Sequence, residues 1–186
     1  MRKLPVILLF LALLSACKLD PVKDAWEYYE DWRNENNAWL DLQLAKTDEQ
    51  GRPYYEKVVP EYDRNACVYI HYFNDRSATS GNLSPMATST CDVKYKMELY
   101  NGTAVDSTFL SKSPADSLMR ADLSGSSYIS GFRIALMAMS VGDSCDIIIP
   151  YQQGYTNVGR GAVLPYSHLR YFMKLVDIPG YERPAN

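Results

Sequence analysis

Residues 127–150 constrain the fold more than any other stretch, because a short amphipathic helix there runs directly into an apolar strand. Four apolar residues recur at i, i+3, i+4 and i+7 and therefore share one helical face: Phe132, Ala135, Leu136 and Met139. Ser130 is the expected N-cap, and Gly142 stands where the helix is expected to stop. An apolar strand at 145–149 follows, and Pro150 ends it by removing a hydrogen-bond donor. This stretch predicts a helix packed on a sheet.

A second stretch, residues 91–99, alternates strictly between apolar and polar side chains. Its apolar members face one side of a strand: Cys91, Val93, Tyr95, Met97 and Leu99. Asn101-Gly102 is a strong turn signal and returns the chain through 103–106. Further strands are expected at 66–73 and 169–178, and loops or connections are expected at 46–65, 74–90, 109–127 and 151–166. The order of elements favours an α+β fold in which an antiparallel sheet wraps over one helix.

An N-terminal amphipathic helix precedes this domain. Six residues, all aromatic or apolar except Glu35, recur at intervals of three and four along it: Ala25, Tyr28, Trp32, Glu35, Trp39 and Leu42. The stripe predicts packing on the downstream domain or on a second copy, which would give a homodimer through residues 24–44. The alternative is a surface that binds client proteins or carbohydrate.

The first residues are expected to be a targeting signal and not part of the fold. Three features are similar to a bacterial lipoprotein signal: the basic pair Arg2-Lys3, the apolar run 6–14 and the sequence Leu14-Ser15-Ala16-Cys17. The resemblance implies cleavage before Cys17 and acylation of that cysteine. The apolar run is well short of the ~20 residues that a membrane span requires. A lipid-anchored protein of the cell envelope is therefore expected, and Lys18 favours the outer membrane of a Gram-negative bacterium.

The remaining cysteines and the two histidines give no sign of a metal or redox site. Buried free thiols are favoured over a disulfide at Cys67, Cys91 and Cys145, because all three lie in apolar, strand-like runs. His71 and His168 are isolated and are read as ordinary strand residues. No cofactor is expected, and a formal net charge of −3 argues against nucleic acid as a partner.

Residues 92–178 resemble FKBP-type peptidyl-prolyl isomerases. The resemblance rests on the order and spacing of short motifs: Val93, Tyr95, Leu99, Gly102, Asp106 and Ser107, then Tyr128-Ile129-Ser130-Gly131-Phe132 with Met139-Ser140-Val141-Gly142, and finally Ile149-Pro150, Gly154-Tyr155, Leu164-Pro165 and Leu169-x-Tyr171. It implies an FKBP-like, half-open, curled antiparallel β-sheet over the short α-helix, with an apolar pocket for a prolyl residue.

Carried over position by position, the resemblance implies a set of site residues. The catalytic group would be Tyr95, Asp106, Ile129, Phe132 and Tyr155, and the substrate-binding group Val105, Tyr128, Leu164 and Tyr171. Phe132 would form the floor. The Ile129 N–H and the Tyr155 hydroxyl would hold substrate carbonyls, with Tyr95 and Asp106 opposite.

Several positions depart from the family pattern. Val105 stands where the family usually has Phe, and Phe132 where it usually has Trp. Residues 119–123 lack the aromatics that commonly lead into the helix, and the chain is one residue shorter around 165–167. These departures predict a shallower pocket and weaker or more selective activity.

The expected function is a peptidyl-prolyl cis-trans isomerase that assists the folding of exported proteins. It would act on proline-containing polypeptides without a covalent intermediate. The alternative is a non-catalytic cell-envelope lipoprotein that binds a peptide, a partner or a glycan on the same fold. The expected organisation is a signal peptide at 1–16, a helical extension and linker at 17–60, an FKBP-like domain at 61–179 and a tail at 180–186.

Overall fold

The computed structural model describes residues 24–109 and 117–180. The predicted signal peptide at 1–16, the predicted acylation site Cys17 and tail residues 181–186 lie outside these ranges. The chain divides into two compact units, and the second begins at Asp31 and holds the sheet. Most of the predicted N-terminal helix thus belongs to the same compact unit as the strands.

In the described ranges, strands are more numerous than helices. The helices are α2 (Ala25–Tyr28), α3 (Glu30–Leu44) and α4 (Ser130–Ala138), with short 3₁₀ turns η1 (Arg76–Ala78) and η3 (Tyr151–Gln153). The strands are β1 (Glu56–Val58), β2 (Val68–Tyr72), β3 (Thr90–Leu99), β4 (Ala104–Ser107), β5 (Met119–Asp122), β6 (Ser144–Ile149) and β7 (Leu169–Asp177). The strands expected around 66–73, 91–99, 145–149 and 169–178 are confirmed with small shifts at their ends.

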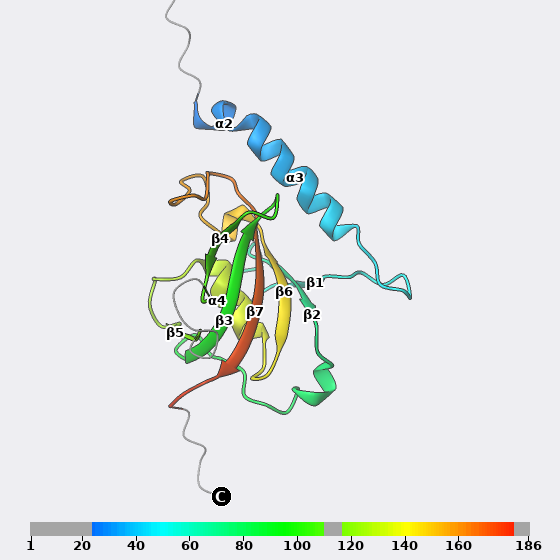
Figure 1. Cartoon of the computed structure of the whole chain (residues 1–186), viewed down its shortest axis with the longest axis vertical. Coiled ribbons are helices and arrows are strands. Elements are labelled where there is room, and N and C mark those ends of the chain that lie inside the picture. The colour runs from blue at the N-terminus through cyan, green and yellow to red at the C-terminus, as the bar shows by residue number, and fades with distance from the viewer. Residues whose placement is uncertain (1–23, 110–116, 181–186) are drawn as a thin grey trace, which may run out of the picture. The chain divides into compact units, whose positions relative to one another are not determined.

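One antiparallel sheet carries all the strands, in the order β1-β2-β6-β7-β3-β4, with β5 also paired to β3 (Figure 1). The path leaves β1 and β4 unjoined, so the sheet is open. The predicted α+β class, with a curled antiparallel sheet over a short helix, is confirmed. The alternation predicted for residues 91–99 is confirmed as well, since Cys91, Val93 and Tyr95 are buried while Lys96 is exposed.

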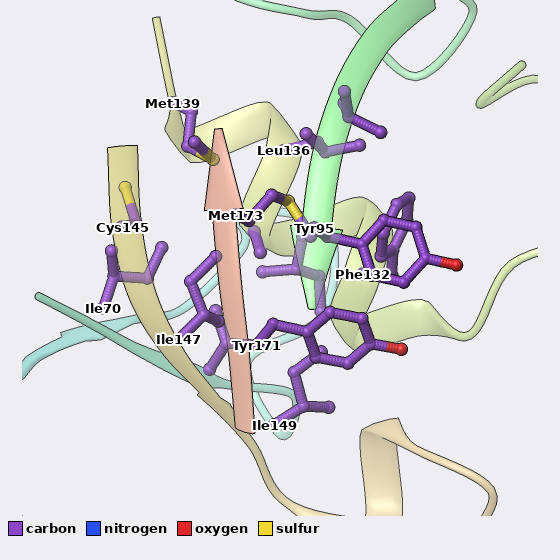
Figure 2. Packing of buried hydrophobic residues seen from close by; sticks show 14 of the residues in the cluster. Ile70, Tyr95, Phe132, Leu136, Met139, Cys145, Ile147, Ile149, Tyr171 and Met173 are labelled. Atoms are coloured by element: carbon purple, nitrogen blue, oxygen red, sulfur yellow. The ribbon is translucent and has the colours of Figure 1, made fainter. Parts of the chain in front are cut away.

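Helix α4 lies against the sheet, and the apolar face predicted from its spacing is buried. Figure 2 shows Phe132 and Leu136 among side chains from β2, β3, β6 and β7. The predicted caps were wrong in detail. Ile129 is the N-cap and makes no side-chain cap bond, because Ser130 is already helical and its hydroxyl donates to Gln153 O at 3.3 Å. The helix ends at Ala138, before Gly142, which instead takes a positive φ of +99° in the turn to β6.

Two short strands were missed. Residues 56–58, expected in a linker, form β1 on β2, and residues 119–122, expected in an irregular loop, form β5 on β3. Both strands are three or four residues long. So short a run carries too little alternation to be recognised, and its pairing with a longer strand is what makes it a strand.

The N-terminal helix differs from the prediction in its buried face. It is broken at Tyr29 into α2 and α3, and the residues that α3 buries are polar: Arg33, Asn36 and Gln43. Tyr28 and Leu42, both in the predicted stripe, are each 70% exposed. Trp32 is half-buried and donates from Nε1 to Ser167 Oγ at 3.1 Å.

Asn36 and Asn37 attach α3 to His168, just before β7. Asn36 Oδ1 accepts from the His168 backbone N–H at 3.0 Å, and the Tyr151 N–H donates to His168 Nδ1 at 3.0 Å. Nδ1 is therefore an acceptor, which leaves the proton on Nε2, 3.1 Å from Asn37 Oδ1. Burial lowers the pKa of His168 from its ordinary value of 6.5 to about 4, against an opposing effect from Asp41.

Tyr55 attaches the next segment to the sheet. Its hydroxyl donates to Asp146 Oδ2 at 2.8 Å, and Arg170 binds the same carboxylate through Nε at 2.9 Å and a terminal nitrogen at 2.6 Å. Asp146 is completely buried. Its hydrogen bond to Arg170 raises the pKa of that guanidinium, while burial and then Asp146 raise the pKa of Tyr55. The bonds of Asn36, Asn37 and Tyr55 to His168 and Asp146, with the Arg170 ion pair, are called the docking contacts below.

The structure shows the environments of His71 and of the three described cysteines. His71 lies in β2 and stacks on Tyr54, with ring centroids 3.6 Å apart. Cys91 and Cys145 are buried free thiols and Cys67 is a half-buried one. In the described ranges, no helix is long and apolar enough to cross a membrane.

Candidate functional site

A cavity of about 340 Å³ opens between α4, the strands β3, β4 and β7 and the loop after η3. Gly131 makes this geometry attainable, because a Cβ there would lie 2.2 Å from Ile149 Cγ2. The first turn of α4 can therefore approach β6 closely, which holds Ile129 and Phe132 at the cavity. The volume falls near the lower end of the range of about 300–1,000 Å³ typical of ligand pockets.

Four aromatic rings form the floor and walls. Phe132 is the hub: Tyr128 stacks on it at 5.1 Å between centroids and 19° between planes, and Tyr171 meets it edge-on at 5.8 Å. Tyr95 closes the group at 6.0 Å from Phe132 and 5.6 Å from Tyr171. Figure 2 shows Tyr95 and Tyr171 with their hydroxyl oxygens directed away from the rest of the buried cluster. Edge-on and offset pairs hold such rings in fixed orientations.

Asp106, the acidic residue beside Tyr95, already accepts two hydrogen bonds within the fold. The Tyr95 hydroxyl donates to Asp106 Oδ2 at 2.6 Å, and the Ser107 N–H donates to Asp106 Oδ1 at 2.8 Å. Burial and then the bond to Asp106 raise the pKa of Tyr95, so the phenol keeps its proton at neutral pH. This pair fixes the Tyr95 ring in the aromatic group.

Two donors of the predicted site have no partner among the described residues. The Ile129 backbone N–H, at the N-cap of α4, makes no hydrogen bond to described backbone or side chains, and neither does the Tyr155 hydroxyl. Burial raises the pKa of Tyr155, and Arg160 partly offsets that rise. Both groups can therefore donate to a carbonyl oxygen of a bound peptide.

The loop after η3 forms the remaining rim. Arg160 and Val163 exchange backbone hydrogen bonds, at 2.8 Å from Arg160 N and 2.9 Å from Val163 N. Gly159 has φ of +72°, and a Cβ there would lie 2.6 Å from Val163 O. A side chain at that position is thus excluded, and the tight turn sets Arg160 at the cavity.

Every site residue expected from the resemblance lines this cavity except Leu164 and the acylation site Cys17, which lies outside the described residues. Leu164 is 39% exposed beside the loop. The cavity also has members that were not predicted: Met97, Met119, Ser127, Arg160, Gly161, Ala162 and Val163. The alternation in β3 could have identified Met97, whereas Met119 depends on the unrecognised strand β5.

Val105 lines the cavity from β4, next to Asp106. The expectation that a smaller side chain here makes the pocket shallower stays a prediction.

Comparisons with known proteins identify the family and the fold. Residues 81–176 match the family model of FKBP-type peptidyl-prolyl cis-trans isomerases. A protein called macrophage infectivity potentiator, from Trypanosoma cruzi, is 31% identical over 129 residues, which are 69% of this chain and 63% of that protein. The chain thus spans less than two thirds of the length of this curated relative.

Two solved structures share the fold. A peptidyl-prolyl cis-trans isomerase from Pseudomonas syringae pv. tomato superposes with a TM-score of 0.61 at 20% identity, covering 81% of this chain and 95% of the other. FkpA from Escherichia coli gives a TM-score of 0.61 at 18% identity, covering 81% of this chain and 62% of the other.

Proposed function

This chain belongs to the family of FKBP-type peptidyl-prolyl cis-trans isomerases, and on that premise we propose that it accelerates rotation about X–Pro bonds in the aromatic cavity. The observation that carries the proposal is the combination of four packed rings with two unpaired donors at one cavity. The rings supply an apolar site for a prolyl side chain, and the donors supply fixed positions for the carbonyls beside it.

The reaction needs no nucleophile and no proton transfer. Rotation about X–Pro faces a barrier of about 20 kcal/mol, because resonance gives the C–N bond double-bond character. In the twisted state the nitrogen lone pair is localised and the amide is less delocalised. An apolar wall tolerates that state, and donors matched to its geometry lower the barrier by binding it more tightly than either planar form.

The proposed roles are those that the family resemblance implies, and the contacts support them. Phe132 is the floor on which the proline ring lies, between Tyr128 and Tyr171. The Ile129 N–H and the Tyr155 hydroxyl each hold a carbonyl oxygen. Asp106 acts as a positioning residue, since its carboxylate orients the Tyr95 ring through the hydroxyl bond.

A protease-free isomerisation assay on short X–Pro peptides tests the proposal. We expect the purified full-length protein to accelerate the exchange, and Asp106→Ala to lower kcat/KM by about tenfold, because Tyr95 loses the partner that orients it. Glu61→Ala is the matched control: it removes an exposed acid outside the cavity. No acceleration by the wild-type protein would leave the non-catalytic binding protein as the better description.

The role in the folding of exported proteins and the lipid anchor at Cys17 are also proposals. They rest on the signal-like sequence before Cys17. Mass spectrometry of the protein from a bacterial host that acylates lipoproteins, compared with Cys17→Ser, tests the anchor. An unmodified Cys17 behind an intact signal peptide would contradict it.

Pairing of two chains through residues 24–44 stays a prediction, supported by the exposure of Trp26, Tyr28 and Leu42. Sedimentation of the full chain tests it, and a monomer at all concentrations would exclude it.

A further inference from the structure

We propose that Arg160 is a specificity-determining residue that favours substrates with a carboxylate side chain next to the proline. This inference rests on the proposed isomerase site and adds a substrate class to it.

The charged residues at the cavity are the first observation that supports this role for Arg160. Among the described residues that line it, only Asp106 and Arg160 are charged. Asp106 already accepts from the Tyr95 hydroxyl and the Ser107 N–H. The guanidinium of Arg160 has no hydrogen bond and no ion pair with any described residue. Both donors are neutral and occupy the Asp106 oxygens without adding a positive charge, so the charged group left without a hydrogen-bond partner at this cavity is the Arg160 guanidinium.

Arg120, which lies near the same cavity, provides a comparison because its guanidinium is paired. Arg120 lines a second cavity that shares Tyr95 and Asp106 with the main one. Its side chain is bound to Asp92 by two hydrogen bonds of 2.9 and 3.0 Å. Arg120 is thus committed to the fold, whereas Arg160 presents five donors with no partner in the described chain.

The backbone around Arg160 is fixed. Paired hydrogen bonds to Val163 close the turn, and the close approach at Gly159 allows only glycine there. The loop therefore fixes the backbone of Arg160 at the rim of the cavity. Only the torsion angles of its side chain must become ordered when a ligand binds. Its charge also reaches Tyr155, the proposed carbonyl donor, since it opposes the rise in pKa that burial causes there.

A peptide seated in the cavity would bring its residues flanking the proline onto this rim. A carboxylate there can form a planar, two-pronged pair with the guanidinium, whereas an amide of the same size cannot carry the charge. Pairs that stay partly exposed are worth little, so we expect about a two- to fivefold preference for Glu over Gln. Salt should reduce this preference.

The test compares kcat/KM for two pairs of peptides, Glu-Pro with Gln-Pro and Pro-Glu with Pro-Gln. The pair with the higher ratio identifies the side of the proline that Arg160 reads. In Arg160→Gln we expect both ratios to fall to about one, and in Arg160→Lys we expect part of the preference to remain. Lys57→Gln is the matched control, because it removes one exposed positive charge from β1, outside the cavity, and should keep the wild-type ratios.

The outcomes separate this inference from the proposed function. Equal rates for Glu and Gln peptides in a protein that isomerises both would overturn the inference and leave the isomerase intact. If the wild-type protein isomerises no peptide, titration of the same four peptides followed by NMR still decides the matter. Equal affinities would then overturn the role of Arg160, and a preference for Glu that disappears in Arg160→Gln would support it.

Discussion

The aromatic cavity and the docking contacts both hold polar groups among apolar ones, yet they differ in whether those groups have partners. In the docking contacts, the buried groups bond to one another: Asp146 accepts from Tyr55 and Arg170, and His168 bonds to Asn36 and Asn37. At the cavity, donors such as the Tyr155 hydroxyl have no partner in the described chain.

The difference shows which polar groups are available to a ligand. A buried polar group that is satisfied within the fold contributes to stability, and its loss leaves partners unpaired. A donor that faces a cavity without a partner costs the fold little when removed. Changes in the docking contacts should therefore alter stability, and changes at the cavity should alter activity.

The largest effect is expected in the docking contacts. Asp146→Asn removes the charge from a carboxylate that Arg170 binds twice, and replaces one of its two acceptor oxygens with an NH₂ group that faces the donors of Arg170 or Tyr55. We expect the free energy of unfolding to fall by about 3 kcal/mol, near the low end for a broken buried pair, because the Arg170 side chain is still 27% exposed. Denaturant titration followed by circular dichroism measures this change.

The exposed Asp31→Asn on α3 is the control, and should change stability by no more than about 0.5 kcal/mol. The rate per folded molecule should stay within about twofold in both variants. If Asp146→Asn lost activity under conditions in which it is fully folded, the docking contacts and the cavity would be coupled. The separation of stability from activity between the two regions would then be wrong.

Acid should weaken the docking contacts next. His168 has a pKa of about 4 in the folded chain and an ordinary value of 6.5, so between these values the unfolded chain binds more protons. Stability therefore falls as pH drops through this window, by about 2 kcal/mol from pH 8 to pH 5. Protonation of His168 Nδ1 would place two N–H donors opposite each other and break the hydrogen bond from the Tyr151 N–H.

Denaturant titrations at several pH values measure this dependence in the wild type, His168→Gln and His71→Gln. We expect His168→Gln to lose most of the slope between pH 6.5 and 4, and His71→Gln to keep it. The same slope in all three proteins would assign it to carboxylates instead.

At the cavity, Tyr155→Phe should show the opposite pattern. Losing one neutral hydrogen bond to the substrate costs about 1 kcal/mol, or about five- to tenfold in kcat/KM. The free energy of unfolding should change by no more than about 0.5 kcal/mol, because the hydroxyl has no partner in the described chain. The isomerisation assay and thermal unfolding are measured together, with Tyr151→Phe as a control outside the cavity. A large loss of stability in Tyr155→Phe would contradict the assignment.

The smallest effect is expected for Val105→Phe. A larger apolar side chain on this wall would add contact with a bound proline, and we expect kcat/KM for a Leu-Pro peptide to rise about two- to threefold. The control is Val158→Phe, at a residue 78% exposed outside the cavity lining. An unchanged or lower rate would show that Val105 does not limit the pocket.

Local patterns in the sequence predicted much of the fold. The alternation at 91–99 and the helical spacing of Phe132 and Leu136 are properties of neighbouring residues, and both survived in the structure. Motif order also identified eight of the fifteen described residues that line the cavity, because the resemblance fixes their positions relative to these elements. Leu164 was the exception, since the loop that carries it turns Val163 inward instead.

What the sequence by itself determined, then, was the strands, the short helix and the aromatic residues between them, since periodicity in a single segment encodes which side is buried. Only the tertiary structure decided that α3 buries polar residues such as Asn36, with Trp32 of its aromatic stripe packed on the core, and that the Arg160 side chain has no partner in the described chain. Both outcomes depend on partners elsewhere in the chain: His168 meets α3 across more than a hundred residues, and Asp106, the only acid among the described residues that line the cavity, already accepts a hydrogen bond from Tyr95. A pattern within one segment cannot encode which distant group has already been satisfied.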